Sequence, residues 1–171
     1  MRKTASRVRP ERLRFMQNIT ALLVHHETQP FRALTHALKR LGMKPRRVRS
    51  LREAREVMAG AETPPLVFTD THLPGGSWAD IVTLAQNASA AVNVIVVARV
   101  VDVHLYMEAL EAGAFDFIVP PFEAPGLEHV VRCAAESVLE RRDAARRLAQ
   151  APQKALFPAL ASHLLAKMAG S

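Results

Sequence analysis

The sequence predicts an α/β fold in which a doubly wound parallel sheet of five strands is covered by helices. Short runs rich in β-branched residues alternate with amphipathic stretches of helical period through the central part of the chain. Turn and capping residues separate these runs at regular intervals. The 171 residues, of which 49% are apolar and 23% charged, are typical of one globular domain with extensions.

The predicted strands differ in polarity. Four of them are mainly apolar, which is typical of strands buried inside a sheet. The second is basic and polar, and it therefore suits a sheet edge. The third runs directly into Asp70. In chain order, the strands are predicted over residues 20–24, 44–48, 66–69, 94–98 and 115–119.

The predicted helices are recognised by the residues that begin and end them. The first spans residues 30–41, and the fifth, over residues 127–139, has one apolar stripe. Capping boxes precede the second and third helices, and an aspartate precedes the fourth. The expected signals are, in order, Pro30 with Gly42, Ser50 with Glu53, Ser77 with Asp80, and Asp102 with Gly113.

The net charge of +7 is concentrated at the ends of the chain. Residues 1–14 hold six Lys/Arg and one acid, residues 139–171 hold six and two, and the segment between has a net charge of −2. Basic arms of this kind can contact nucleic acid or an acidic protein, although solvated tails are commoner. The predicted division is a basic extension over residues 1–17, a domain over 18–141 and a C-terminal helical extension over 142–171.

The C-terminal extension carries one apolar stripe, spaced four residues apart. An isolated helix of this length is marginal in water. We therefore expect the stripe to pack on its own domain or on a second copy, and the sequence leaves both open. The stripe consists of Leu156, Leu160, Leu164 and Met168.

Cysteine content and hydropathy suggest a cytoplasmic protein. The one cysteine, Cys133, cannot form an internal disulfide. The basic N-terminus lacks the apolar stretch of a secretory signal. The longest apolar run, residues 94–101, is interrupted by Arg99 and is too short to cross a bilayer.

Two motifs resemble the receiver domains of response regulators. The stretch DTHLPGG at residues 70–76 is similar to their phosphoacceptor loop, and EALEAGAFDF at residues 108–117, followed by Pro121, resembles their passage from the fourth helix to the fifth strand. The likeness covers residues 18–140. It implies a CheY-like sheet with strand order 2-1-3-4-5, in which functional residues collect at the carboxyl ends of the strands.

The resemblance also implies that most of the phosphorylation machinery is replaced. A working receiver holds magnesium with two acids after the first strand and the acceptor aspartate, because a hard cation prefers oxygen ligands. The acceptor position is Asp70, but the two acids are matched by His25 and His26. The hydroxyl residue after the fourth strand is matched by Val97, and the lysine after the fifth by Pro120. The sequence therefore predicts a degenerate receiver that binds no cofactor.

Other features of the pocket leave alternatives open. Phe117 matches the aromatic switch position and is expected to be fixed and buried, and the Pro120–Pro121 bond is expected to be cis. The histidines beside Asp70 suggest a transition-metal site or a pH response in which the carboxylate favours the charged imidazole. Adjacent histidines on an extended strand point to opposite faces, so only one is expected to enter the pocket.

Three functions follow from these observations. The first is a phosphorylation-independent protein-interaction module that binds a histidine kinase or another signalling protein, or itself, through the face from the fourth helix to the fifth or through the C-terminal helix. The second is a regulator phosphorylated at Asp70. The third is nucleic-acid binding by the basic arms, without a recognisable DNA-reading motif. No nucleophile–base pair or phosphate loop supports an enzyme.

Overall fold

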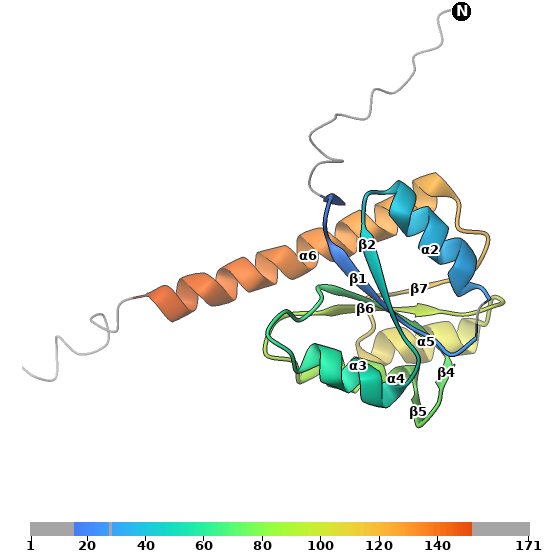
Figure 1. Cartoon of the computed structure of the whole chain (residues 1–171), viewed down its shortest axis with the longest axis horizontal. Helices are drawn as coiled ribbons and strands as arrows, with labels where there is room; N and C mark the ends of the chain where they lie inside the picture. Colours follow the sequence, from blue (N-terminus) through green and yellow to red (C-terminus); the bar gives the residue numbers. More distant parts are fainter. Residues whose placement is uncertain (1–15, 28, 152–171) are drawn as a thin grey trace, which may run out of the picture.

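The computed structural model describes residues 16–27 and 29–151. Five parallel strands form one sheet in the order β2-β1-β3-β6-β7 (Figure 1). This is the predicted order 2-1-3-4-5, so the CheY-like fold is confirmed. The strands of the sheet are β1 (Thr20–Val24), β2 (Lys44–Val48), β3 (Leu66–Asp70), β6 (Asn93–Val97) and β7 (Asp116–Ile118).

Helices cover both faces of the sheet and enclose two apolar cores. On one face lie α2 (Phe31–Arg40) and α6 (Ala124–Gln150). The other face is covered by α3 (Leu51–Met58), α4 (Trp78–Gln86) and α5 (Val103–Ala112). The inner strands are apolar in both directions because each of their faces meets a layer of helices.

Local sequence signals start and stop these helices as predicted. Ser50 Oγ accepts a hydrogen bond from Glu53 N at 3.2 Å, and Ser77 forms a capping box with Asp80. Asp102 Oδ1 accepts from Leu105 N at 3.0 Å, which caps α5. The same helix ends at a glycine with φ of 102°, a conformation that residues with a Cβ rarely adopt.

A short hairpin, which the sequence did not predict, follows β3. Its strands are β4 (His72–Leu73) and β5 (Gly76–Ser77), joined through Pro74 and Gly75. Gly75 has a φ of 84°, in the left-handed region that favours glycine. The hairpin holds the loop after Asp70 in a defined shape at the edge of the candidate site.

The last helix joins the predicted fifth helix to the charged stretch of residues 141–150, whose sequence continues the helical pattern. It begins at Ala124 and runs without interruption to Gln150, so the predicted domain boundary at residue 141 falls inside it. Arg142 fastens it to the sheet: Nε donates to Ala91 O at 2.8 Å and a terminal nitrogen to Thr63 O at 3.0 Å. Figure 1 shows the end of α6 extending beyond the sheet.

The two ends of the chain were assigned to extensions. Met16, inside the predicted N-terminal extension, is buried in the core beside α2 and α6. The apolar stripe from Leu156 to Met168 lies outside the described residues. Within the described part of the chain, no helix combines the length and hydrophobicity that a membrane span requires.

Candidate functional site

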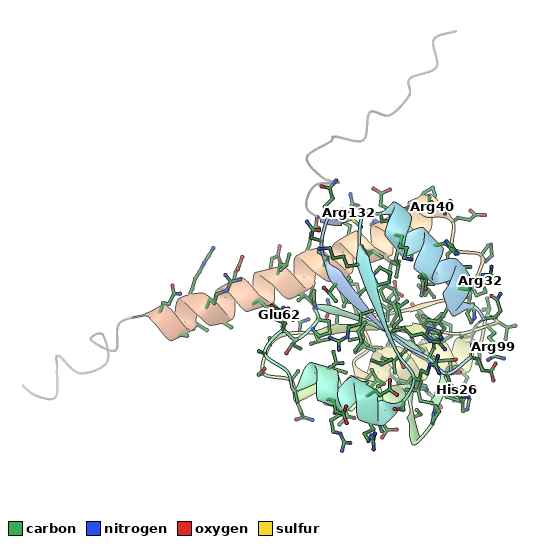
Figure 2. All side chains as sticks on the ribbon, viewed as in Figure 1. His26, Arg32, Arg40, Glu62, Arg99 and Arg132 are labelled. Carbon is green, nitrogen blue, oxygen red and sulfur yellow. The ribbon has the colours of Figure 1, made fainter. Side chains whose placement is uncertain are left out.

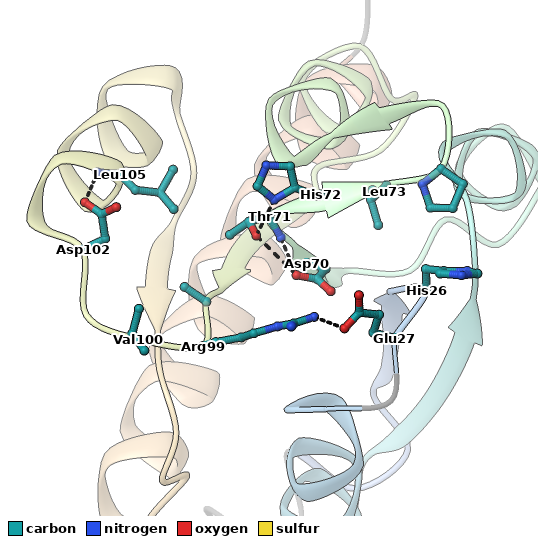
Figure 3. Close-up of a pocket in the computed structure, with 12 residues that line it drawn as sticks. His26, Glu27, Asp70, Thr71, His72, Leu73, Arg99, Val100, Asp102 and Leu105 are labelled. Atoms are coloured by element: carbon teal, nitrogen blue, oxygen red, sulfur yellow. Dashed lines mark hydrogen bonds and ion pairs between the residues drawn. The ribbon is translucent and has the colours of Figure 1, made fainter.

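A pocket of about 560 Å³ opens at the carboxyl edge of the sheet, where parallel α/β folds place their sites (Figure 3). Loops after β1, β3 and β6 line it. The predicted acceptor, Asp70, is the last residue of β3 and is only 5% exposed. Its Oδ1 accepts a hydrogen bond from Thr71 N at 2.8 Å, so the carboxylate is oriented by its own loop.

An ion pair crosses this pocket. Glu27, in the loop after β1, binds the guanidinium of Arg99, in the loop after β6 (Figure 3). Both side chains are more than half exposed, at 60% and 55%. The pair joins the loops on either side of Asp70 and places a cation in the pocket. In the sequence Arg99 stands out only as a break in an apolar run, but its place directly after a strand is the signal that marks it as a site residue.

The two histidines after β1 have different surroundings. His26 lines the pocket, whereas His25 is 4% exposed and stacks on Phe31 with ring centroids 4.2 Å apart. His25 Nδ1 donates to Glu27 O at 2.5 Å. The expectation that one of the two enters the pocket is therefore confirmed, and the direction follows from strand alternation.

The charge state of His25 differs from the expectation. Burial lowers its pKa below the ordinary value of 6.5, and the nearby guanidinium of Arg47 acts in the same direction. The hydrogen bond to Glu27 and the charge of Asp70 oppose this shift without overcoming it. The predicted pairing of a charged histidine with Asp70 is wrong for His25, because its ring is desolvated against Phe31.

The end of β6 also differs from the expectation. Val97 is fully buried in the core that α2 and α6 cover, and Ala98 lines the pocket instead. Consecutive strand residues point in opposite directions, so an alignment that is wrong by one residue assigns a core side chain to the pocket. Neither side chain has a hydroxyl group. The position facing Asp70 therefore offers no side-chain hydrogen-bond donor.

The remaining predicted residues lie outside the Asp70 pocket. Pro120 and Pro121 are joined by a cis bond, as expected, and line a separate hollow at the start of α6. Phe117 is only half-buried, so the expectation of full burial is wrong. Its ring meets Tyr106 edge to face at 5.9 Å. The reason is that β7 is a short edge strand, which α5 covers only in part.

The residues of the pocket do not fit a magnesium ion. Three carboxylates line it, and each has another partner: Glu27 binds Arg99, Asp70 accepts from Thr71, and Asp102 caps α5. Imidazole is a poor magnesium ligand. Between residues 16 and 151, leaving out residue 28, no group of three His, Cys, Asp or Glu side chains could hold a metal ion.

Comparisons with known proteins agree with the fold. The family model of the response regulator receiver domain matches residues 21–132. The response regulator protein PilR of Pseudomonas aeruginosa is 33% identical over 119 residues, which are 70% of this chain and 26% of that protein. The C4-dicarboxylate transport transcriptional regulatory protein DctD of the same organism is 30% identical over 126 residues, 71% of this chain and 27% of that protein.

Solved structures show the same fold. NtrX from Brucella abortus superposes with a TM-score of 0.64 at 22% identity, covering 76% of this chain and 29% of that one. The chain spans about a quarter of the length of the curated relatives that it matches. The family match covers well over half of the chain and contains the Asp70 pocket. The chain therefore belongs to the response-regulator receiver family of two-component signalling.

Proposed function

We propose that the chain is a phosphorylation-independent receiver that acts, without enzymatic activity, as a protein-interaction module in the cytoplasm. The observation that carries this proposal is the pair of Glu27 and Arg99 across the Asp70 pocket. It supplies a cation in the pocket that contains Asp70 and engages a carboxylate of the same pocket. The loops around the acceptor are thus already linked in the unmodified protein.

The chemistry of phosphoryl transfer supports the same conclusion. Transfer to a carboxylate depends on positioning and on neutralisation of the developing charge. The two family acids are matched by His25 and His26, of which only His26 lines the pocket, and Ala98 offers no hydroxyl. Pro120 has neither an ammonium group nor a backbone N–H, and it lies outside the pocket. Asp70 is left without the groups that would make it a good acceptor.

The partner-binding face is proposed to lie on α5 and β7. Six large hydrophobic side chains are exposed among the described residues, and five of them lie in or just before α5. Tyr106 joins this group to Phe117 on β7. Apolar patches that the protein leaves exposed to water mark interaction sites in monomeric domains. The five exposed side chains are Val100, Val101, Val103, Tyr106 and Met107.

A second candidate function is regulation by phosphorylation of Asp70. It is favoured by one observation: the aspartate stands at the end of β3 in an open pocket, where a small phosphodonor could reach it. In this case a histidine kinase or its phosphotransfer partner would bind near the pocket. The two candidates differ in whether the conformation responds to a phosphoryl mimic.

Amide NMR spectra with magnesium and beryllofluoride test this difference. We expect the spectrum of the parent chain to stay unchanged, since nothing but Asp70 is left to hold the mimic. A matched positive control restores the family groups and removes the Arg99 cation with His25→Asp, His26→Asp, Ala98→Thr, Pro120→Lys and Arg99→Ala. We expect this variant to bind the mimic, and the variant with the two aspartates alone to gain magnesium binding only. Shifts spreading from β6 to α5 in the parent would contradict the proposal.

A further inference from the structure

The positive charge of the folded domain is concentrated at one edge of the sheet. Residues 31–55 hold nine Lys/Arg and one acid, whereas residues 56–138 hold two Lys/Arg and eleven acids. The net charge of −2 over residues 15–138 therefore conceals two regions of opposite sign. All nine cations are exposed, and together they form what we call the basic edge: Arg32, Lys39, Arg40, Lys44, Arg46, Arg47, Arg49, Arg52 and Arg55.

Three neighbouring elements present the basic edge. The central one, β2, is an edge strand of the sheet, with α2 on one face beside it and α3 on the other. Figure 1 shows these three elements together on one side of the molecule, and Figure 2 labels Arg32 and Arg40 near the two ends of α2. The cations thus surround an open strand edge.

Few acidic groups neutralise the basic edge. Of its nine cations, only Arg52 forms an ion pair within the described residues, with Glu56 at 3.7 Å. Glu53 is engaged by the backbone, since its Oε2 accepts from Arg49 N at 3.0 Å. Glu62 is the one acid that lines a hollow with Lys44 and Arg46. Most of the positive charge is therefore available to a partner.

The composition of the basic edge favours phosphate as that partner. Seven of its nine cations are arginines, whose planar guanidinium groups bind phosphate oxygens in pairs. None of the large exposed hydrophobic side chains in the described chain lies on α2, β2 or α3. Protein interfaces depend on buried aromatic and aliphatic anchors. A dense set of cations without such anchors matches the backbone of a nucleic acid better than a protein surface.

The described part of the chain begins close to the basic edge. The chain enters the sheet beside the start of β2, because Asn18 N donates to Gly42 O at 3.1 Å and Lys44 N to Ile19 O at 2.9 Å. Residues 1–14, with six Lys/Arg, thus precede a point that adjoins the basic edge.

We propose that the basic edge binds the sugar–phosphate backbone of duplex nucleic acid without reading its sequence.

Fluorescence anisotropy with labelled duplex DNA of random sequence tests this proposal on the full chain. The test variant is Arg46→Gln/Arg49→Gln/Arg55→Gln. The matched control, Arg132→Gln/Arg146→Gln/Arg147→Gln, removes the same charge from α6. Each phosphate contact contributes about 0.9 to the slope of log affinity against log salt, so we expect the test variant to lose roughly three units of slope. The control should lose less than one.

Four results would overturn the proposal. The parent chain could fail to bind DNA at low salt, or both variants could lose the same slope, which would reflect net charge alone. Displacement of DNA by polyglutamate at equal charge concentration would identify an acidic polypeptide as the ligand. Light scattering at each salt concentration detects self-association. Self-association of the parent that the test variant abolishes would show that the basic edge binds a second copy of the chain. None of these results depends on Asp70.

Discussion

The apolar core and the Asp70 pocket are built from the same strands, yet they depart from the family to very different degrees. Phe68 and Asp70 stand two residues apart on β3, one fully buried between helices and the other at the pocket. The core keeps every predicted strand and cap. Around the pocket, we propose that Asp70 alone of the family's phosphorylation groups is retained, and the structure shows the pair of Glu27 and Arg99 there.

This contrast indicates that burial of apolar side chains stabilises the receiver fold independently of the groups that phosphorylation requires. The fold is stabilised by side chains that the site does not use, such as Leu23, Ile95 and Val131. The predictions below test whether the two regions are as separable as the structure indicates.

The largest effect is expected in the core. Phe68→Ala removes a fully buried ring and should lower the free energy of unfolding by about 3–5 kcal/mol, because the surrounding side chains cannot fill the cavity. Asp70→Asn keeps the acceptor for Thr71 N and should cost less than about 1 kcal/mol. Urea unfolding measures both. Equal losses of stability would show that Asp70 is a structural residue, and the contrast between the core and the pocket would then be wrong.

A smaller effect is expected where α6 meets the amino end of the sheet. Arg142→Ala removes two hydrogen bonds, to Thr63 O and Ala91 O, and should cost about 1–3 kcal/mol. Arg147→Ala is the matched control, since this exposed side chain lies one turn further along α6. Hydrogen exchange in α6 should rise for the first variant only. Equal behaviour of the two variants would mean that Arg142 does not fasten the helix.

The smallest effect concerns pH. The pKa of His25 is lower in the folded protein than in the unfolded chain. As the pH falls below 6.5, His25 therefore binds a proton more readily in the unfolded chain than in the folded protein. The stability that neutral His25 contributes is thus present above that value and is lost as the pH falls through the folded pKa. The melting temperature of His25→Gln should approach that of the parent from about pH 7.5 to about pH 5. A constant difference would exclude this linkage.

Much of the fold could be predicted from the sequence because its signals are local. The caps at Ser50, Ser77 and Asp102 are set by neighbouring residues, and the structure reproduces each of them. The extent of α6 could also be predicted, because the helical pattern continues past Arg141 as a charged stretch until Pro152 interrupts it. The strand order came from the resemblance to receivers.

The candidate site could be predicted only in part. Its position and Asp70 follow from the motif after β3, but β6 is apolar on both faces, so no alternation distinguishes Val97 from Ala98. The pair of Glu27 and Arg99 joins residues 72 positions apart, which no local pattern reveals. The basic edge could be predicted from the sequence, but its positive charge is cancelled by the acidic residues 56–138 when the charge of the whole domain is summed.

Intact-mass spectrometry after incubation with acetyl phosphate and magnesium tests the central claim most directly. The account predicts an unmodified mass for the parent chain, since the groups that neutralise and position a phosphoryl group are absent around Asp70. The variant with His25→Asp, His26→Asp, Ala98→Thr, Pro120→Lys and Arg99→Ala serves as the positive control. A stoichiometric phosphate adduct on the parent that disappears in Asp70→Asn would contradict the account and establish Asp70 as a working acceptor.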